Sequence, residues 1–503
     1  MQMRERRERY GESREGNSGC AQARGCGRRA KGGGRRQART PIEADAIPAH
    51  SAWRGAICTQ PEPDNFKLLS TMKVLNYDSK DFWKRLKAAC KPAAASDGVA
   101  KAAAEVIAAV RKRGDAAVAE FTKKFDGADL RPKNFSVTPE EFEAARSQVS
   151  PADRRQIAAA INCVKKFHAR TKPKNWRAKN PHGATVGENF YPIRRVGIYV
   201  PGGAAPLVST VVMTATLAKL AGCDEICVCT PPNAKGSVDA HILCALDLLG
   251  VREVYKVGGA QAIAAMGIGT ARIPRADKIF GPGNAFVIEA KRQLFGEVGC
   301  DLLPGPSEEL VIADASCNPR FVAADLLSQA EHGSGREKIY LVSLSKKLVD
   351  DVRALLPKMA AELPRADKLM KIIEDGCCAA IVGNLEEAVK VANFVAPEHM
   401  ELHVKNAEKL AKKIRTAGAI LCGGFTPTVL GDFTAGPSHT LPTGGTGRFS
   451  SGLQLSDFMR RSSFVKYDRA AAARAMQTVA AFASMEKLDA HSASLAMRLK
   501  GEK

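Results

Sequence analysis

The chain has 503 residues, 45% of them hydrophobic, which is enough to bury the cores of two or more domains. Its formal net charge is +22, yet aromatic residues make up only 6% and no basic stripe is interleaved with them, so nucleic-acid binding is not expected. No run approaches the roughly 18 apolar residues of a membrane span. The 14 cysteines include no C-x-x-C pair, and several lie in apolar runs, which favours a reducing, cytoplasmic setting over a disulfide framework.

Residues 1–71 differ in composition from the rest of the chain. The first 40 residues contain twelve Lys and Arg against four Glu and few apolar side chains. Such a composition is typical of disorder. Met72 then begins MKVLNYDSKDFWKRL, which looks like an ordinary protein start. We therefore expect residues 1–71 to be a disordered basic extension or a start-site artefact.

Helical and strand patterns alternate along the remainder. Two helical runs between 98 and 126 each end at glycine, and a polar helical stretch is expected from there to about residue 190. Short apolar runs then alternate with helical runs: first VGIYV, EICVCT, VYKV and DKIF, and later LVIAD, KIYLVSL, AAIVG, MELHV and AILCGG. A glycine-rich stretch at 423–447 and an alanine-rich helical tail at 468–499 finish the chain. Strands that alternate with helices predict parallel sheets.

These patterns predict an α/β protein with two Rossmann-like parallel-sheet lobes and small arms at both ends. The expected domains are an N-terminal arm with the helical part of a first α/β lobe (72–193), an inserted Rossmann-like lobe (194–305), the remainder of the first lobe (306–445) and a C-terminal arm (446–503).

Three strands of the inserted lobe are followed by glycine or proline, at 201–203, 258–259 and 281–284. Ligands of open parallel sheets bind at the carboxyl ends of strands, where glycine lets the backbone approach closely. This placement favours a nucleotide site. No G-x-G-x-x-G motif or P-loop occurs, however, so tight turns without a ligand explain the glycines equally well.

Five of the nine histidines follow residue 330, and four of them lie near acids or amides. Imidazole beside carboxylate is what metal binding and proton transfer near neutral pH both require. Gln329 and His332 lie three apart in a helical run, so both face one way and can reach one ion. A structural histidine at a helix end is the alternative.

Glu398 and His399 lie at an expected helix-to-strand turn, where Pro397 ends the helix. Neighbours in extended chain point opposite ways, so the two side chains would serve different reacting atoms. His403 falls within the strand-like MELHV and is expected to be structural.

Two further pairs combine an acid with an imidazole. Asp432 and His439 share the glycine-rich stretch, and Glu486 and His491 share EKLDAH in the tail. A plain turn explains the first pair and a solvated helix junction the second, so neither pair identifies a site by itself.

As literal strings, eight segments resemble the histidinol dehydrogenase family: GIYVPGG, VGGAQAIAA, FGPGNAFVIEAKRQLFG, GPSEELVIAD, SQAEHG, APEHMEL, GDFTAGPSHTLPTGGTGRFSSGL and EKLDAH. They occur in the family's order from about residue 72 to the end. The resemblance implies a cytoplasmic enzyme that closes histidine biosynthesis by oxidising L-histidinol through L-histidinaldehyde to L-histidine with two NAD⁺ in turn.

The resemblance also implies the site residues. One Zn²⁺ per subunit would be held by Gln329, His332, Asp432 and His491. Glu398 and His399 would be the catalytic acid–base pair. The substrate would contact Ser307, Gln329, His332, His399, Asp432, His439, Glu486 and His491. NAD would contact Tyr199, Gln261 and Asn284, which lie in the inserted lobe.

In the family the C-terminal tail is exchanged between the subunits of a homodimer, so Glu486 and His491 would complete the neighbouring subunit's site. A relative that oxidises another polar alcohol, such as a sulfonated diol, is the nearest alternative, and retention of these two residues argues against it. A basic binding protein that has kept the fold without catalysis is a second alternative, which the intact set of ligand-type residues disfavours.

Overall fold

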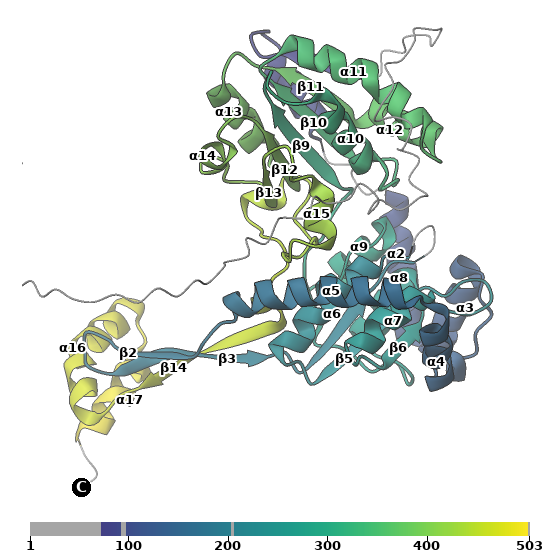
Figure 1. Cartoon of the computed structure of the whole chain (residues 1–503). Coiled ribbons are helices and arrows are strands. Elements are labelled where there is room, and N and C mark those ends of the chain that lie inside the picture. The colour runs from purple at the N-terminus through teal and green to yellow at the C-terminus, as the bar shows by residue number, and fades with distance from the viewer. Residues whose placement is uncertain (1–71, 92–96, 203–205, 501–503) are drawn as a thin grey trace, which may run out of the picture. The chain divides into compact units, whose positions relative to one another are not determined.

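The structure, a computed structural model, describes residues 72–91, 97–202 and 206–500 (Figure 1). The expected extension, 1–71, lies outside the described residues. The fold is α/β with two parallel sheets, of five and six strands, and a third sheet of three antiparallel strands. None of the described helices is long and apolar enough to cross a membrane.

The five-stranded sheet has the order β6-β5-β4-β7-β8. All its strand pairs are parallel, and every residue of β4 is buried because parallel sheets are covered on both faces. The strands are β4 (Arg195–Tyr199), β5 (Glu225–Thr230), β6 (Glu253–Lys256), β7 (Lys278–Phe280) and β8 (Gly299–Cys300). The connecting helices are α6 (Val208–Ala221), α7 (Ala240–Leu248), α8 (Gly259–Ile268) and α9 (Ala285–Leu294).

Four N-terminal helices pack on this same lobe: α2 (Asp97–Arg113), α3 (Asp115–Asp126), α4 (Pro139–Gln148) and α5 (Pro151–His168). Helix α2 contacts α8 and α9, α4 contacts α7, and α5 contacts α6. The expectation placed residues 72–193 with the other lobe, and for these four helices the structure differs. The buried face of α2, which includes Val106 and Val110, packs into one core with Ile263 and Leu294. Helical periodicity reveals such a face but not the sheet that it covers.

The six-stranded sheet has the order β1-β11-β10-β9-β12-β13, and all its strand pairs are parallel. Its strands are β1 (Lys73–Asn76), β9 (Glu308–Ala313), β10 (Lys338–Ser343), β11 (Cys377–Ile381), β12 (His399–His403) and β13 (Ala419–Cys422). The helices of this lobe are α1 (Phe82–Ala89), α10 (Pro319–Ala330), α11 (Lys346–Ala361), α12 (Ala366–Gly376), α13 (Leu385–Val395), α14 (Ala407–Ala411) and α15 (Thr428–Phe433). Helix α15 lies inside the stretch that the sequence indicates only as a glycine-rich loop.

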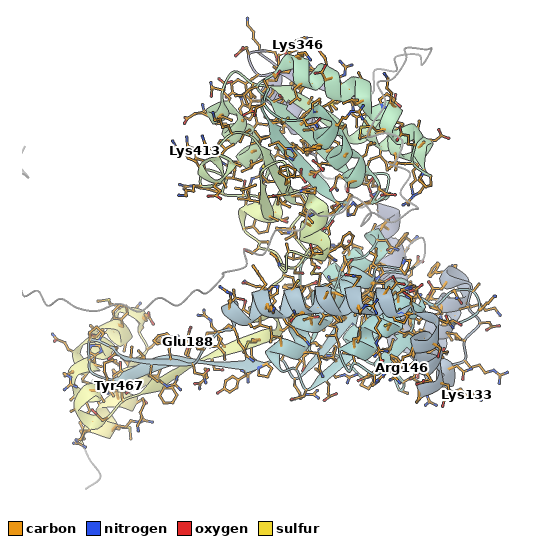
Figure 2. All side chains as sticks on the ribbon, in the orientation of Figure 1. Lys133, Arg146, Glu188, Lys346, Lys413 and Tyr467 are labelled. Carbon is orange, nitrogen blue, oxygen red and sulfur yellow. The ribbon has the colours of Figure 1, made fainter. Side chains whose placement is uncertain are left out.

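The third sheet joins segments far apart in sequence, in the order β14-β3-β2. Its strands are β2 (Trp176–Lys179), β3 (Thr185–Pro192) and β14 (Met459–Lys466). The expected helical stretch to about residue 190 is therefore wrong after the end of α5 and the short 3₁₀ turn 169–171. Polar contacts hold these strands: Glu188 accepts a hydrogen bond from Trp176 Nε1 (2.9 Å) and pairs with Arg461 (Figure 2).

The C-terminal tail is two helices rather than one, α16 (Arg469–Glu486) and α17 (Asp489–Lys500), which pack on each other. Lys487, with a φ of 58°, adopts the left-handed conformation that ends α16. Phe482, Met485 and Met497 of these helices are exposed. The tail therefore carries apolar side chains that the described residues do not cover.

Candidate active site

The candidate site lies where β9 and β12 begin, not where they end. These strands are hydrogen-bonded neighbours, and His399, the first residue of β12, stands opposite Glu309 of β9. Ala396 takes a left-handed conformation with a φ of 52° and ends α13, so Pro397 and Glu398 lead directly into β12. Such a conformation costs free energy in a residue other than glycine and is often found at functional sites.

The Glu398 carboxylate is fixed by two donors. Ser307 Oγ donates to Glu398 Oε2 at 2.6 Å, and the Glu308 amide donates to the same oxygen at 2.9 Å. Burial raises the pKa of Glu398 to about 8, although both hydrogen bonds act to lower it. The carboxyl group is therefore largely protonated at neutral pH unless a cation approaches.

His399 is buried and lies between two carboxylates. Its Nδ1 is 3.9 Å from Glu398 Oε2, and its Nε2 is 3.8 Å from Asp432 Oδ1. Burial, reinforced by the nearby His332, lowers the pKa of His399 to about 3, so the imidazole is neutral. Nδ1 has no hydrogen-bond partner among the described residues. A buried, neutral imidazole with a free nitrogen can accept a proton or bind a metal ion.

Gln329 and His332 come from the C-terminal end of α10. Gln329 is buried, and neither atom of its amide group has a hydrogen-bond partner in the described chain. Buried amides are normally paired, so these two atoms call for an explanation. His332 follows the helix end, and its Nδ1 is 3.2 Å from the Gln329 carbonyl oxygen. His332 acts electrostatically on His399, His439 and Asp432 and lowers the pKa of each, so these residues lie around it.

Asp432 lies in α15, and His439 lies in the loop that follows. Burial raises the pKa of Asp432 to about 6, opposed by His332. Burial lowers the pKa of His439 to about 4, and its Nε2 has no hydrogen-bond partner in the part of the chain that the structure describes. The structure therefore brings together seven sequence-predicted residues from four segments: Ser307, Gln329, His332, Glu398, His399, Asp432 and His439.

A second buried polar cluster lies deeper in the same lobe. His403 Nε2 is 2.9 Å from Glu401 Oε2 and 3.4 Å from Asp325 Oδ2. The three donor atoms lie close enough together to hold a metal ion. Thr428 Oγ1 links the cluster to Glu309, because it lies 2.9 Å from Glu309 Oε1 and 2.8 Å from Glu401 Oε1. His403 is a buried strand residue, as expected, but no sequence pattern indicates this cluster.

The two clusters share their supporting elements. Asp325 precedes Gln329 by about one turn of α10, and Thr428 precedes Asp432 by about one turn of α15. Glu401 follows His399 by two residues of β12, so both side chains lie on one face of the sheet. Burial raises the pKa of Asp325 to about 9. Burial alone would raise the pKa of Glu401 too, but hydrogen bonds with His403 and Thr428 lower it below its ordinary value.

The expected cofactor residues lie in the other lobe. Tyr199 is buried, and its hydroxyl accepts a hydrogen bond from the Gly259 amide at 3.1 Å. Gln261 is also buried and donates from Nε2 to Asp126 at 3.3 Å. Asn284 is exposed and caps α9. Within the described residues, no hydrogen bond or ion pair joins these three residues to the Glu398–His399 cluster.

The glycines near these residues are required by close packing. A Cβ on Gly202 would lie 2.9 Å from Pro231 Cγ, and one on Gly258 would lie 2.5 Å from Pro231 Cβ. Gly281, with a φ of +112°, would place its Cβ 2.1 Å from the Tyr199 carbonyl oxygen. Three loops therefore meet at the carboxyl edge of the five-stranded sheet, and tight turns account for their glycines.

Glu486 and His491 do not join the cluster. Both are exposed, at the end of α16 and in α17. Over residues 72–91, 97–202 and 206–500, no hydrogen bond or ion pair connects either side chain with Gln329, His332, His399 or Asp432. A single chain therefore supplies three of the four expected zinc ligands at one place.

Comparisons with known proteins identify the family of the chain. Residues 90–499 match the model of the histidinol dehydrogenase family. Histidinol dehydrogenase of Synechococcus sp. is 42% identical over 394 residues, which are 78% of this chain and 91% of that protein. Histidinol dehydrogenase of Syntrophotalea carbinolica is 41% identical over 430 residues, 85% of this chain and 99% of that protein.

A solved structure agrees as well. The crystal structure of histidinol dehydrogenase from Elizabethkingia anophelis superposes with a TM-score of 0.82 at 35% sequence identity, covering 86% of this chain and 98% of that one. The residues matched by the family model include β2 to β14, and so every described strand but β1, together with the residues gathered at the start of β9 and β12. The chain therefore belongs to the histidinol dehydrogenase family of oxidoreductases.

Proposed function

We propose that the chain is a zinc-dependent, NAD-linked histidinol dehydrogenase that oxidises L-histidinol through L-histidinaldehyde to L-histidine, the last step of histidine biosynthesis, in the cytoplasm. The observation that carries this proposal is the convergence of a buried acid–base pair, Glu398 and His399, with unpaired ligand atoms of Gln329 and His439. A sulfonated diol as the substrate is not favoured, because the relatives compared above are all named for histidinol.

The residues at the site fit a zinc ion. Gln329 offers a buried amide oxygen without a partner, His332 an imidazole, and Asp432 a carboxylate 3.8 Å from His399 Nε2. Nitrogen and oxygen donors of this kind are zinc ligands. Gln329, His332 and Asp432 would hold the ion with His491 of a second subunit. When bound, zinc would orient the imidazole and amine of histidinol and polarise the carbinol oxygen.

His399 is suited to remove the hydroxyl proton of histidinol. Burial lowers the pKa of His399, which keeps the imidazole neutral but makes it a weaker base, and the free Nδ1 is available to accept the proton of a carbinol hydroxyl that zinc would polarise. NAD⁺, when bound, would accept the hydride that leaves the carbinol carbon. Each turnover of this half-reaction converts the alcohol to the aldehyde and releases one proton. General base catalysis of this kind contributes about 10²–10⁴-fold.

Glu398 is suited to the second half-reaction, in which water adds to the aldehyde before a second hydride leaves. Ser307 Oγ and the Glu308 amide hold the carboxylate in place and leave its other oxygen, Oε1, free to accept a proton from water. With a pKa of about 8, this carboxyl group changes state near working pH. A carboxyl group with its pKa raised toward the working pH is a better general base than an ordinary one.

A homodimer would bring the tail residues to the site. Glu486 and His491 are exposed in this chain, and the tail helices also expose Phe482, Met485 and Met497. A second subunit that covered these apolar side chains would bury the tail and receive its two site residues. Tyr199, Gln261 and Asn284 would contact NAD, and of these only Asn284 is exposed in the present conformation.

Stoichiometry tests the proposed function. Purified protein is mixed with limiting L-histidinol and excess NAD⁺, and the NADH formed is counted by absorbance. Two NADH per histidinol, with L-histidine as the product, are expected. One NADH per histidinol, or none, would contradict the assignment.

A further inference from the structure

Lys291 and Asp301 form an ion pair whose side chains are only 0% and 1% exposed. Lys291 belongs to α9, and Asp301 directly follows β8. The proposed mechanism uses neither residue. Burying two charges costs desolvation free energy, and apolar residues of similar size are often as stabilising as a buried ion pair. Stability alone therefore does not explain this pair.

The pair holds both backbone polar groups of one residue, Gly281. Lys291 Nζ donates to the Gly281 carbonyl oxygen at 2.9 Å, and the Gly281 amide donates to Asp301 Oδ2 at 2.7 Å. Lys291 also donates to the Leu302 carbonyl oxygen at 2.8 Å and to Asp301 Oδ1, so all three protons of its ammonium group are used. The ion pair thus clamps the loop that follows β7 onto the segment that follows β8.

Gly281 begins the loop 281–284. This loop carries Asn284, an expected cofactor contact, and Gly281 itself packs against Tyr199, another expected contact. Its backbone passes so close to Tyr199 that a Cβ would lie 2.1 Å from the Tyr199 carbonyl oxygen. The loop ends at Asn284, which caps α9 through hydrogen bonds from the Phe286 and Val287 amides at 3.0 and 3.1 Å. The position of Gly281 therefore sets how Asn284 stands relative to Tyr199.

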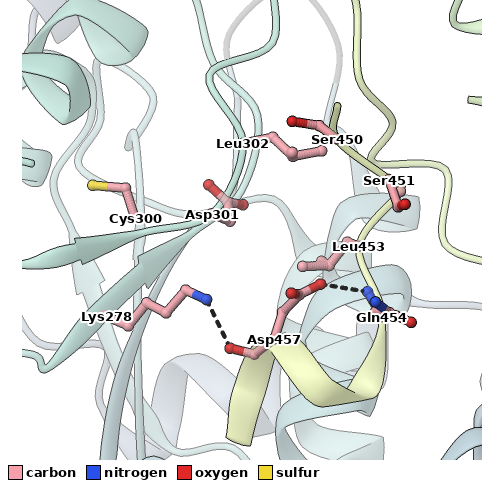
Figure 3. Close-up of a pocket in the computed structure, with 10 residues that line it drawn as sticks. Lys278, Cys300, Asp301, Leu302, Ser450, Ser451, Leu453, Gln454 and Asp457 are labelled. Atoms are coloured by element: carbon pink, nitrogen blue, oxygen red, sulfur yellow. Dashed lines mark hydrogen bonds between the residues drawn. The ribbon is translucent and has the colours of Figure 1, made fainter. Parts of the chain in front are cut away.

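The Asp301 carboxylate has two hydrogen-bonding neighbours among the described residues, and Lys278 acts on it only through its charge. In the described residues its only hydrogen-bond donors are Gly281 and Lys291. On its other side Asp301 lines a cavity of about 300 Å³, which Lys278, Ser450 and Gln454 also line (Figure 3). Lys278 turns away from Asp301 and donates to the Asp457 carbonyl oxygen at 2.8 Å. Loss of the ion pair would therefore free Gly281 without another partner to replace it.

We propose that the Lys291–Asp301 pair is a positioning device that holds the loop 281–284 in the conformation that binds the dinucleotide. The inference rests on the proposed NAD-linked function. A loop that is ordered in advance does not lose conformational entropy when the ligand binds, so the pair contributes to NAD⁺ affinity and not to the oxidation itself.

The test replaces both charges together, because one unpaired buried charge would destabilise the fold. In the full chain, Lys291→Met/Asp301→Leu is expected to raise the KM for NAD⁺ about tenfold. This is the increase expected if the freed loop spends about one-tenth of the time in the conformation that binds NAD⁺. The KM for L-histidinol and the kcat at saturating NAD⁺ should not change. A merely structural role would not separate the two KM values in this way.

The matched control is a second ion pair of the same lobe. Arg146 Nε lies 2.7 Å from Asp247 Oδ2 and joins α4 to α7 (Figure 2). Arg146→Met/Asp247→Leu removes an equal number of charges away from the loop 281–284, and the KM for NAD⁺ should stay at the wild-type value.

Hydrogen exchange gives a readout that does not depend on activity. Peptides covering 278–294 should exchange faster in the Lys291→Met/Asp301→Leu variant than in wild type and in the control. A folded double variant with an unchanged KM for NAD⁺ overturns the proposal, whatever its exchange rates. If the double variant does not fold, Lys291→Met/Asp301→Asn, which also leaves no unpaired charge and removes the donor to the Gly281 carbonyl oxygen, decides by the same KM. Wild-type protein that forms no NADH from L-histidinol overturns the proposed function itself, and this inference with it.

Discussion

His399 Nε2 lies 3.8 Å from Asp432 Oδ1, although the two residues come from the start of β12 and from a short helix 33 positions later. The contact places the expected base beside an expected metal ligand. Only Nε2 of His399 faces Asp432, and Nδ1 on the other side of the ring has no hydrogen-bond partner among the described residues. Proton transfer by His399 and metal binding by Asp432 can therefore be tested separately.

His399→Ala should therefore retain zinc and lose most of its turnover. Gln329, His332 and Asp432 stay in place in this variant, whereas the group that accepts the hydroxyl proton is absent. We expect kcat to fall about 10²–10⁴-fold. Metal content by mass spectrometry and NADH formation are measured on the same preparation, and an unaffected rate would remove His399 as the base.

His332→Ala should strip the metal and leave the chain folded. His332 is exposed beyond the end of α10, so its removal creates no cavity. We expect the zinc content and the activity to fall together while the circular dichroism spectrum and the oligomeric state are retained. His241→Ala, at a partly exposed histidine of α7, is the control. Full zinc occupancy in His332→Ala would show that the ligand assignment is wrong.

Oxidation of L-histidinaldehyde should depend on pH through Glu398. Burial raises the pKa of this carboxyl group to about 8, and only the ionised form can accept a proton from water. The kcat/KM for the aldehyde should therefore rise with pH up to about 8 and level off above it. Glu398→Gln should abolish this dependence and slow the second NADH more than the first. A profile that is flat between pH 6 and 9 in the wild type would contradict the role, since those limits bracket the pKa by about one unit or more.

Glu401→Gln tests the buried cluster beneath the site. Glu401 is fully buried and receives hydrogen bonds from Thr428 and His403, which hold its pKa below the ordinary value. Loss of the charge should lower the free energy of unfolding by about 2–3 kcal/mol, as for other buried charge-assisted hydrogen bonds. Denaturant unfolding measures the change, and Glu362→Gln on the exposed end of α11 serves as the control.

The stability of the wild type should depend on pH through the ionisation of Glu401. A carboxyl group with a lowered pKa in the folded state stabilises the protein above its unfolded pKa, and this stabilisation is lost as the pH falls through the folded value. The difference in stability between wild type and Glu401→Gln should therefore shrink in acid. A difference that grows as the pH falls would contradict this sign.

The sequence predicts the two parallel sheets well because buried parallel strands are short apolar runs, as in β4 and β9, where every residue is buried. The sequence does not predict the antiparallel sheet, because all four residues of β2 are exposed and show no alternation of apolar and polar side chains. The sequence does not predict which lobe helices α2 to α5 pack on, because an amphipathic pattern shows that a helix has a buried face but not which sheet covers that face.

Residue patterns select Glu398, His399 and the neighbouring pairs of an imidazole with an acid or amide as candidates, but only the resemblance joins them into one site. Pattern reasoning directs attention to the carboxyl ends of parallel strands, whereas Glu398 and His399 stand at the amino end of β12. The buried cluster of Asp325, Glu401 and His403 gave no signal at all, since its members come from α10 and β12, which lie about 70 residues apart in sequence.

The end of α10 at Ala330 has a consequence for the charge of the molecule that enters the site. A helix leaves its last carbonyl groups unpaired, and they give this end a partial negative charge of about half a unit. Gln329 and His332 stand there, and Asp432 adds a carboxylate, whereas the raised pKa of Glu398 keeps that group largely protonated at neutral pH. This end of α10 therefore favours a metal cation or an ammonium group beside Gln329 and Asp432.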